Sequence, residues 1–204
     1  SDDLTSMVET RRVDLVVTGL PPADAEPFEV LPVLTEPFIV VVARRRMASH
    51  ASLEEMRKLP FVHYGRSMPM GRRIIQHLRR LRIDLPERYS FDATRSVFAM
   101  VKTIGGWAIT TPLCVCDSER FWPELEFRPL PFAGFARTIH LVARRGELGH
   151  LPEDLAARCR ALIRSRLVSK IEPIMPWVGD DFRVLGEDEA VTRAAACGPS
   201  AAEC

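Results

Sequence analysis

Apolar residues recur at intervals of three and four along residues 96–104, from Val97 to Ile104. This spacing is typical of a helix with one buried face. Two glycines follow, and because glycine adopts left-handed backbone without a steric penalty, they predict that the helix ends there. A short apolar run at residues 107–111 then predicts a strand, which Pro112 closes.

The rest of the chain alternates between strand-like and helix-like patterns. Strands are expected at residues 13–17, 30–34, 38–43, 60–64, 88–91, 125–130 and 138–143, and helices at residues 4–10, 52–56, 67–83 and 153–168. Ser52 and Glu55 have the spacing of a capping box. Pro32 argues against a central place for its strand, whereas residues 13–17 have the composition of a buried parallel strand. This alternation predicts an α/β fold with mostly parallel sheets.

Composition narrows the possible functions. The chain has 204 residues, with 28 basic and 27 acidic side chains. A protein that holds DNA by itself normally carries a basic excess, so this balance argues against DNA binding by this chain alone. No apolar run approaches the roughly 20 residues that span a bilayer, and the N-terminus does not resemble a secretory signal, so we expect no membrane partner.

Five cysteines, an odd number, argue against a disulfide framework. Cys114 and Cys116 are interpreted as reduced, half-buried structural thiols. A metal site at this pair would need further ligands, which the spacing of the histidines does not supply. We therefore expect no metal, no cofactor and a cytoplasmic location.

Several segments resemble, in the correct order, the effector-binding domain of LysR-type bacterial transcription regulators. The helix, glycine turn, strand and proline at residues 96–112 resemble that family's signature. Further similarities lie at residues 13–17, 31–38, 53–61 and 137–144, with a looser one at residues 44–48. The resemblance runs from about Leu4 to Arg166. One departure is Trp107, which stands where the family often has a small residue and which we expect to pack inside the smaller lobe.

The resemblance implies a two-lobe, type II periplasmic-binding-protein-like fold that is N-terminally incomplete. Residues 1–62 and 138–175 would form an incomplete first lobe, residues 63–137 the second, and residues 176–204 a poorly ordered tail. Family members also carry a winged helix-turn-helix, which this sequence lacks. We therefore expect DNA contact only through a helix-turn-helix absent from this chain, and homo-oligomer formation.

Polar residues follow three of the expected strands, where ligands of open α/β sheets bind. These residues are Thr18, Gly19, Arg66, Ser67, Asp92 and Thr94. Hydroxyl side chains beside helix N-termini, with an adjacent arginine, suit a carboxylate or phosphate. The positions match those where the family contacts its effectors. The hypothesis is a small anionic metabolite bound between Arg66, Ser67 and Thr94 on one lobe and Thr18 and Gly19 on the other.

Each of these residues also has a purely structural interpretation. Ser67 and Thr94 suit helix N-caps, and Arg66 suits a solvated surface charge. Asp92 would repel an anion unless it caps the helix or meets a donor group on the ligand. The arginine-rich helix at residues 72–82 is interpreted as a solvated face or an oligomer contact, and His63 as a buried histidine with its hydrogen bonds satisfied.

No nucleophile elbow, phosphate loop or zinc-protease motif occurs, so we predict no enzyme activity and no catalytic residues. The leading hypothesis is the effector-sensing domain of a LysR-family regulator. The alternatives are a free-standing solute-binding protein of the same fold and a non-functional truncated fragment.

Overall fold

The computed structural model describes residues 3–44 and 52–186. The helices, including 3₁₀ and π segments, are α1 (Asp3–Glu9), α2 (Leu53–Met56), α3 (Pro69–Arg80), α4 (Thr94–Ile104), α5 (Pro112–Cys116), η1 (Glu119–Glu124), α6 (Leu151–Leu162), η2 (Ile163–Val168), α7 (Ser169–Ile171) and η3 (Pro176–Asp181). The strands are β1 (Leu15–Thr18), β2 (Phe28–Pro37), β3 (Ile39–Ala43), β4 (Val62–Tyr64), β5 (Tyr89–Phe91), β6 (Trp107–Thr110), β7 (Leu125–Arg128), β8 (Ala136–Arg144) and β9 (Arg183–Val184).

The described chain divides into two compact units. The first unit comprises residues 36–137 and 166–182, and the second comprises residues 3–35, 138–165 and 183–186. Strand β3 therefore belongs with residues 63–137, whereas the sequence analysis grouped it with residues 1–62. Its five residues are all buried, which is expected for a central strand covered on both faces.

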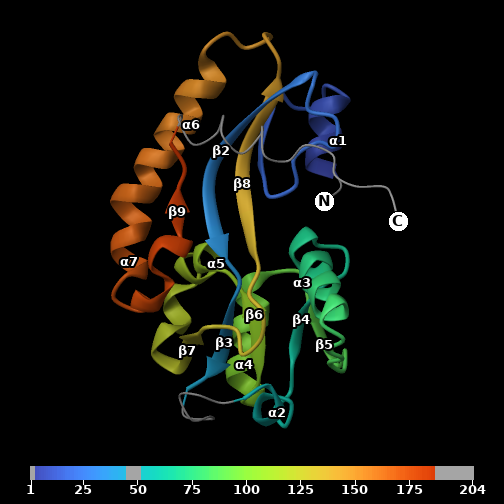
Figure 1. The fold of residues 1–204 in the computed structure, drawn as a ribbon, viewed down its shortest axis with the longest axis vertical. Helices are drawn as coiled ribbons and strands as arrows, with labels where there is room; N and C mark the ends of the chain where they lie inside the picture. The colour runs from blue at the N-terminus through green and yellow to red at the C-terminus, as the bar shows by residue number, and fades with distance from the viewer. Residues whose placement is uncertain (1–2, 45–51, 187–204) are drawn as a thin grey trace, which may run out of the picture. The chain divides into compact units, whose positions relative to one another are not determined.

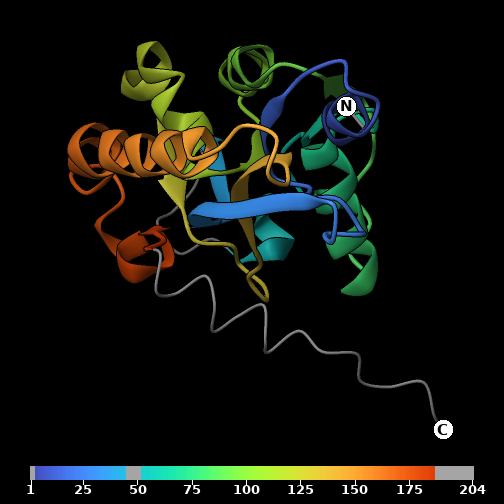
Figure 2. The ribbon, with the colours of Figure 1, turned by 90° about the horizontal axis from the view of Figure 1, so that it is seen from above.

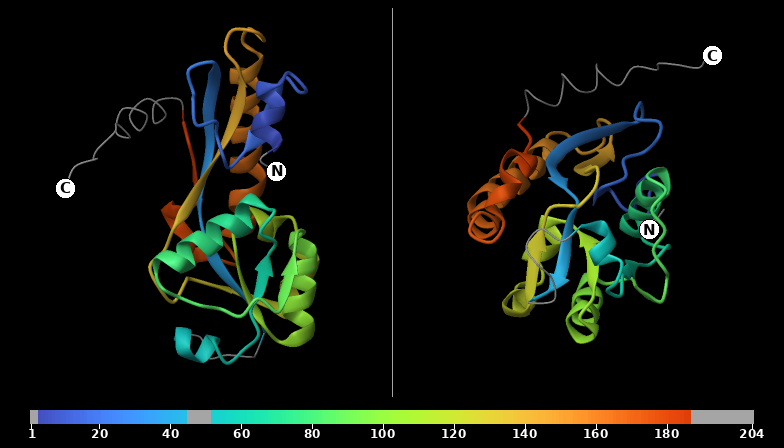
Figure 3. Two further views of the ribbon diagram at one scale, coloured as in Figure 1. Left: turned by 90° about the vertical axis from the view of Figure 1, so that its right-hand side faces the viewer. Right: turned by 60° about the horizontal axis from the view of Figure 1, so that its bottom comes forward.

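The first unit is built on short strands that run beside one another. Strands β4 and β5 pair in parallel, and their arrows point the same way in Figure 3. A parallel bridge between Phe61 and Trp107 connects this pair to β6. Strand β3 lies between β6 and β7 and runs antiparallel to both.

The second unit holds a four-stranded sheet in the order β1–β8–β2–β9, with β8 beside β2 in Figure 1. Its β1–β8 and β2–β9 pairs are antiparallel. The prediction of mostly parallel sheets is therefore wrong, because strand–helix alternation does not reveal which strands become neighbours. Residues 13–17 are likewise not a buried parallel strand: β1 is an antiparallel edge strand in which Val17 is 49% exposed.

Pro32 lies inside β2, at a position that the neighbouring strand β9 does not reach. The short β9 pairs only with Leu34 and Thr35. The carbonyl oxygen of Pro32 instead accepts hydrogen bonds at 3.1 and 2.7 Å from the buried Arg160 guanidinium of α6. Helix α6 runs alongside the sheet in Figure 2. The expectation that Pro32 keeps its strand from a central place is wrong, because β2 lies between β8 and β9; the proline is tolerated because β9 is too short to pair with it.

The helix, glycine turn, strand and proline at residues 96–112 fold as expected. Helix α4 ends at Gly105, whose φ of 64° is the left-handed conformation of a glycine cap. Strand β6 follows directly, and the indole of Trp107 is fully buried against Phe61. Pro112 closes the strand by opening α5. The capping box of Ser52 and Glu55 is also present.

Residues 176–186 are ordered parts of the fold, so the expected tail does not begin at residue 176. They form η3 and β9 because Val178, Phe182 and Leu185 are buried. Residues 187–204 and 45–51, the latter including most of the looser similarity at residues 44–48, lie outside the described residues. Within the described part of the chain, every helix is too short or too polar to cross a membrane.

Candidate functional site

Three parallel strands of the first unit end at a common edge. Strand β4 ends at Tyr64, β5 at Phe91 and β6 at Thr110, in the register set by the β4–β5 ladder and the Phe61–Trp107 bridge. Helices α3 and α4 begin just after β4 and β5. Such an edge is the usual ligand site of an open α/β sheet, because loops and helix N-termini converge there.

Two glycines allow α3 to begin close to the strand ends. A Cβ atom on Gly71 would lie 2.1 Å from the carbonyl oxygen of Gly65, and one on Gly65 would lie 1.9 Å from a carboxylate oxygen of Asp92. Neither position has room for a side chain. The first turn of α3 and the start of the loop after β5 are therefore packed closely against the end of β4.

Both helices begin without a side-chain cap. The N-cap of α3 is Met68 and that of α4 is Ala93, and neither side chain accepts a backbone hydrogen bond. The interpretation of Ser67 and Thr94 as N-caps is therefore wrong, since each lies one residue away from the cap. Backbone N–H groups of a first turn have no partner within the helix, and the helix dipole favours a negative charge beside them.

The structure brings Ser67 and Asp92 together but directs Arg66 elsewhere. The Ser67 hydroxyl donates to the Asp92 carboxylate at 3.1 Å. The Arg66 guanidinium donates from Nε to Glu87 at 2.8 Å. This hydrogen bond lowers the pKa of the Glu87 carboxyl and raises that of Arg66. Arg66 is thus an exposed but paired cation.

Thr94 takes part in a hydroxyl network that the sequence analysis did not identify. The Tyr64 hydroxyl, at the end of β4, donates to the Thr94 hydroxyl at 3.3 Å and lies 3.0 Å from that of Thr110. Tyr64 is 3% exposed, and this burial raises the pKa of its phenol well above the ordinary value. The phenol therefore stays protonated and orients Thr94.

A buried ion pair lies next to this network and was also missed. Glu36 is fully buried and accepts from Arg137 Nε at 2.8 Å and from the backbone N–H of Leu113 at 2.8 Å. Arg137 also donates to the Thr111 hydroxyl at 3.1 Å. Burial alone would lower the pKa of the Arg137 guanidinium, but Glu36 together with other neighbouring groups outweighs it, so that the pKa is raised. Arg137 therefore remains a fixed cation near the strand ends.

The sequence of this domain matches a family model over most of its length. Residues 1–165 match the LysR substrate binding domain. The chain belongs to this family. No curated protein matches the chain.

Solved structures of LysR-type regulators share the fold of this LysR domain at low sequence identity. The Corynebacterium glutamicum OxyR C206 mutant aligns with a TM-score of 0.67 and 18% identity, over 84% of this chain and 55% of that protein. The Synechocystis PCC6803 CcmR regulatory domain in complex with 2-PG gives 0.64 and 13%, over 79% and 78%. The effector-binding domain of QuiR in complex with shikimate gives 0.59 and 11%, over 76% and 73%. The LysR domain thus spans about half of the OxyR chain. These similarities show the two-lobe, type II periplasmic-binding-protein-like fold.

Thr18 and Gly19 belong to the second unit of this LysR domain. The Thr18 hydroxyl accepts from the backbone N–H of Leu20 at 3.1 Å, so it closes a local turn at the end of β1. The Thr5 hydroxyl donates to the Leu20 carbonyl at 2.8 Å and holds the same turn. A contact between Thr18 or Gly19 and an effector stays a prediction.

His63 is buried in the LysR domain, as expected, but its hydrogen bonds are not satisfied. The ring is 6% exposed and lies edge-on to Phe61, and Nε2 has no partner among the described residues. Burial lowers the pKa of this imidazole. No pattern in the sequence indicates this missing partner.

The described cysteines, Cys114, Cys116 and Cys159, are free thiols. Burial raises the pKa of Cys116 to about 11, which keeps this thiol protonated and unreactive at neutral pH. The interpretation of Cys114 and Cys116 as reduced thiols is confirmed. In residues 3–44 and 52–186, the acidic, histidine and cysteine side chains form no cluster that could hold a metal ion.

Proposed function

We propose that this LysR domain is the effector-sensing part of a DNA-binding transcription regulator and that its effector is a small hydroxylated carboxylate. The effector would bind at the carboxyl ends of β4 and β5. The observation that carries the proposal is that α3 and α4 both begin at this edge without a side-chain cap.

The charge of the effector follows from these two helix starts. Pro69 has no N–H group and that of Ser96 donates to the Ala93 carbonyl, but the other first-turn N–H groups present donors and partial positive charge, which suit one carboxylate. The Thr94 hydroxyl, oriented by Tyr64, adds a further polar group at α4. A similar structure with an anionic ligand supports the choice, since the QuiR effector-binding domain was solved with shikimate, a hydroxylated carboxylate.

Asp92 supplies the second requirement on the effector. A bare anion would be repelled by this carboxylate, whereas a hydroxyl group on the ligand can donate to it. The Ser67 hydroxyl already donates a hydrogen bond to the Asp92 carboxylate, so this carboxylate can accept hydrogen bonds from hydroxyl groups at the site. A molecule with a carboxylate and at least one hydroxyl satisfies the helix starts and Asp92 together.

The remaining parts of the proposal extend beyond the first unit. Thr18 and Gly19 of the second unit would also contact an effector, and the domain would act as a homo-oligomer with DNA-binding segments supplied outside this chain. Effector binding would change the arrangement of the oligomer and so reposition those segments. The proposal assigns the chain no catalytic step and retains the expectation of a cytoplasmic location.

Binding of shikimate, with its neutral methyl ester as control, tests the proposal. We expect calorimetric titration to give a measurable affinity for the acid and at least a roughly tenfold weaker one for the ester, because charge-assisted hydrogen bonds are lost. Thr94→Val should weaken acid binding, and Arg79→Gln, on the exposed side of α3, should leave it unchanged. Equal affinity for acid and ester, or no binding by a wider panel of hydroxy acids, would refute the proposal.

A further inference from the structure

The opposite, amino-terminal edge of β4 and β5 carries a second pocket. It lies within the first unit and has a volume of about 250 Å³. Its walls come from residues 57–61, which lead from α2 into β4, and from residues 85, 86, 88 and 89, at the start of β5. Because β4 and β5 are parallel, this pocket and the proposed effector site lie at opposite ends of the same strands.

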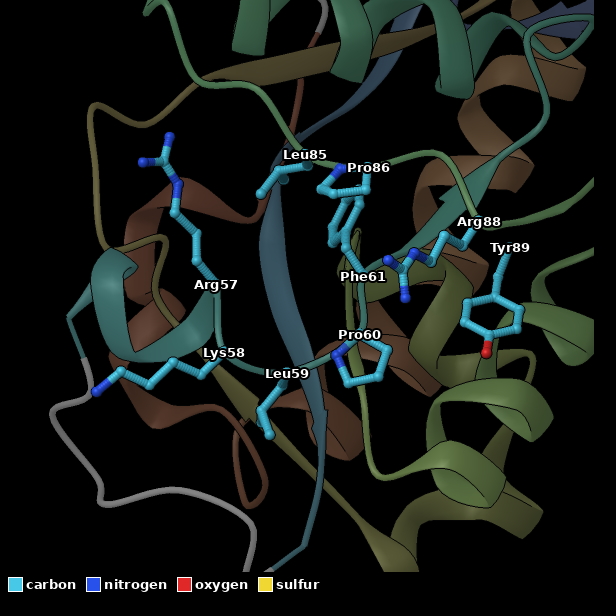
Figure 4. Close-up of a pocket in the computed structure, with 9 residues that line it drawn as sticks. All are labelled: Arg57, Lys58, Leu59, Pro60, Phe61, Leu85, Pro86, Arg88 and Tyr89. Atoms are coloured by element: carbon cyan, nitrogen blue, oxygen red, sulfur yellow. The ribbon is translucent and has the colours of Figure 1, made fainter.

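The body of the pocket is formed mainly by apolar residues. Six of its lining residues are Leu59, Pro60, Phe61, Leu85, Pro86 and Tyr89. In Figure 4, Leu85 and Pro86 lie at the top of the pocket and Leu59 and Pro60 below them. Apolar side chains such as these pack favourably against an aromatic ring. A cavity of 150 Å³ is known to hold benzene, so this volume accommodates a ring with a substituent.

The remaining lining residues are all cationic. Arg57, Lys58 and Arg88 line the pocket, and no acidic residue does. Figure 4 shows Arg57 on one side and Arg88 on the other, whereas Lys58 extends away from the centre. Among the described residues, none forms an ion pair with Arg57 or Arg88, whereas Lys58 interacts electrostatically with Glu55.

The helix α2 can explain the presence of two of these cations, Arg57 and Lys58, but not that of Arg88. Arg57 and Lys58 follow a short helix, where positive charge is favourable. Arg88 comes from a separate segment, thirty residues after Lys58, and gains nothing from that helix. The nearby Glu87 is already paired with Arg66. Two segments thus bring unpaired cations to one apolar hollow.

The wall formed by Phe61 is held firmly in place. Its ring contacts Trp107 at a centroid distance of 4.5 Å, and His63 lies edge-on to it at 4.5 Å. Trp107 is fully buried, so Phe61 cannot turn away without disturbing the core. The hollow is therefore an established part of the fold.

We propose that this pocket is a second ligand site, which takes a small organic anion with a flat aromatic ring. The ring would lie against the apolar side chains of Leu59 and Pro86, and the anionic group would be attracted by the guanidinium groups of Arg57 and Arg88 on either side. The concave shape and limited volume favour a small molecule over a peptide or nucleic acid. This site does not depend on the proposed effector site.

Titration with 2-naphthoate tests the proposal, using 2-naphthamide as the neutral analogue and acetate as the anion without a ring. We expect 2-naphthoate to shift the backbone amide NMR signals of residues 57–59, 61, 85 and 87–89, and to bind roughly tenfold more tightly than either control. The variants Arg57→Gln and Arg88→Gln should each weaken binding at least about threefold, whereas Arg79→Gln, an equally exposed charge on α3, should not.

The outcomes separate this site from the effector site. Thr94→Val should leave 2-naphthoate binding unchanged, and Arg88→Gln should leave shikimate binding unchanged. Leu59→Trp, which fills the hollow without removing a charge, should also abolish binding of 2-naphthoate. Shifts confined to residues 65–68 and 92–95, equal affinity for 2-naphthamide, or equal weakening by Arg79→Gln would each overturn the proposal.

Discussion

Glu36 and Arg137 form an ion pair at 2.7 Å in which the carboxylate is fully buried. The two residues are 101 positions apart and are the first and last residues of the long segment of the first unit. The same carboxylate accepts the backbone N–H of Leu113. The pair therefore ties together both ends of this segment and the start of α5.

Removing one member of this pair should destabilise the protein strongly. Glu36→Leu or Arg137→Met leaves its partner charged and buried, and we expect a loss of about 3–5 kcal/mol in the free energy of unfolding. The double variant should lose clearly less than the sum of the two. Urea unfolding followed by circular dichroism measures all three. The exposed Arg95–Asp117 pair is the control, and Asp117→Asn should cost less than about 1 kcal/mol.

The Tyr64 hydroxyl should contribute to stability as well as to the site. Tyr64→Phe removes its hydrogen bonds to Thr94 and Thr110, and Thr110 is fully buried. We expect a loss of about 0.5–1.5 kcal/mol in the free energy of unfolding. Tyr89→Phe is the matched control, since the Tyr89 hydroxyl has no partner among the described residues. Equal effects of the two substitutions would contradict the network.

Gly105→Ala should destabilise α4 at its end. The backbone of Gly105 is left-handed, which costs a residue with a Cβ atom about 1–2 kcal/mol. Gly134 provides the comparison, because it lacks a positive φ and a Cβ atom there would meet nothing within 4 Å. Gly134→Ala should change the free energy of unfolding by less than about 0.5 kcal/mol. Similar melting temperatures for the two variants would show that the cap is not strained.

Stability should fall as the pH is lowered from 7.5 to 5.5. Burial lowers the pKa of His63 and of His140 below the ordinary value of 6.5. In this range the unfolded chain binds more protons than the folded one, so the free energy of unfolding decreases as pH falls through 6.5. At pH values above 6.5 the two neutral imidazoles no longer reduce the free energy of unfolding.

The variants His63→Leu and His140→Leu test the origin of this dependence. Each should flatten the pH profile measured by urea unfolding, because one buried imidazole no longer titrates. His63→Leu should also be no less stable at pH 7.5, since Nε2 has no partner among the described residues. A profile of unchanged slope in both variants would contradict the assignment.

Local patterns in the sequence predicted local structure well. The 3.6-residue spacing before Gly105 located α4, and the Ser52–Glu55 spacing located the start of α2. Both depend on residues within a few positions of each other. Strand direction depends instead on which strands become neighbours, and nothing in residues 13–17 indicates that β8 runs antiparallel beside them.

In the candidate site, too, the sequence predicted local features but not the contacts between residues far apart in the chain. The sequence placed Ser67, Asp92 and Thr94 after strands, and β4 and β5 bring the loops that carry them to one edge. It did not reveal that Tyr64 orients Thr94 or that Glu36 holds Arg137, because those partners are 30 and 101 residues apart. It also placed the caps of α3 and α4 one residue from their true positions.

The most direct test of the central claim is an amide NMR titration of the whole chain with shikimate and related hydroxy acids. We expect at least one acid, but not its methyl ester, to shift the signals of residues 65–68, 70 and 92–95, and Thr94→Val to weaken the effect. Shifts that avoid both helix starts, or an equal response to the neutral esters, would contradict it.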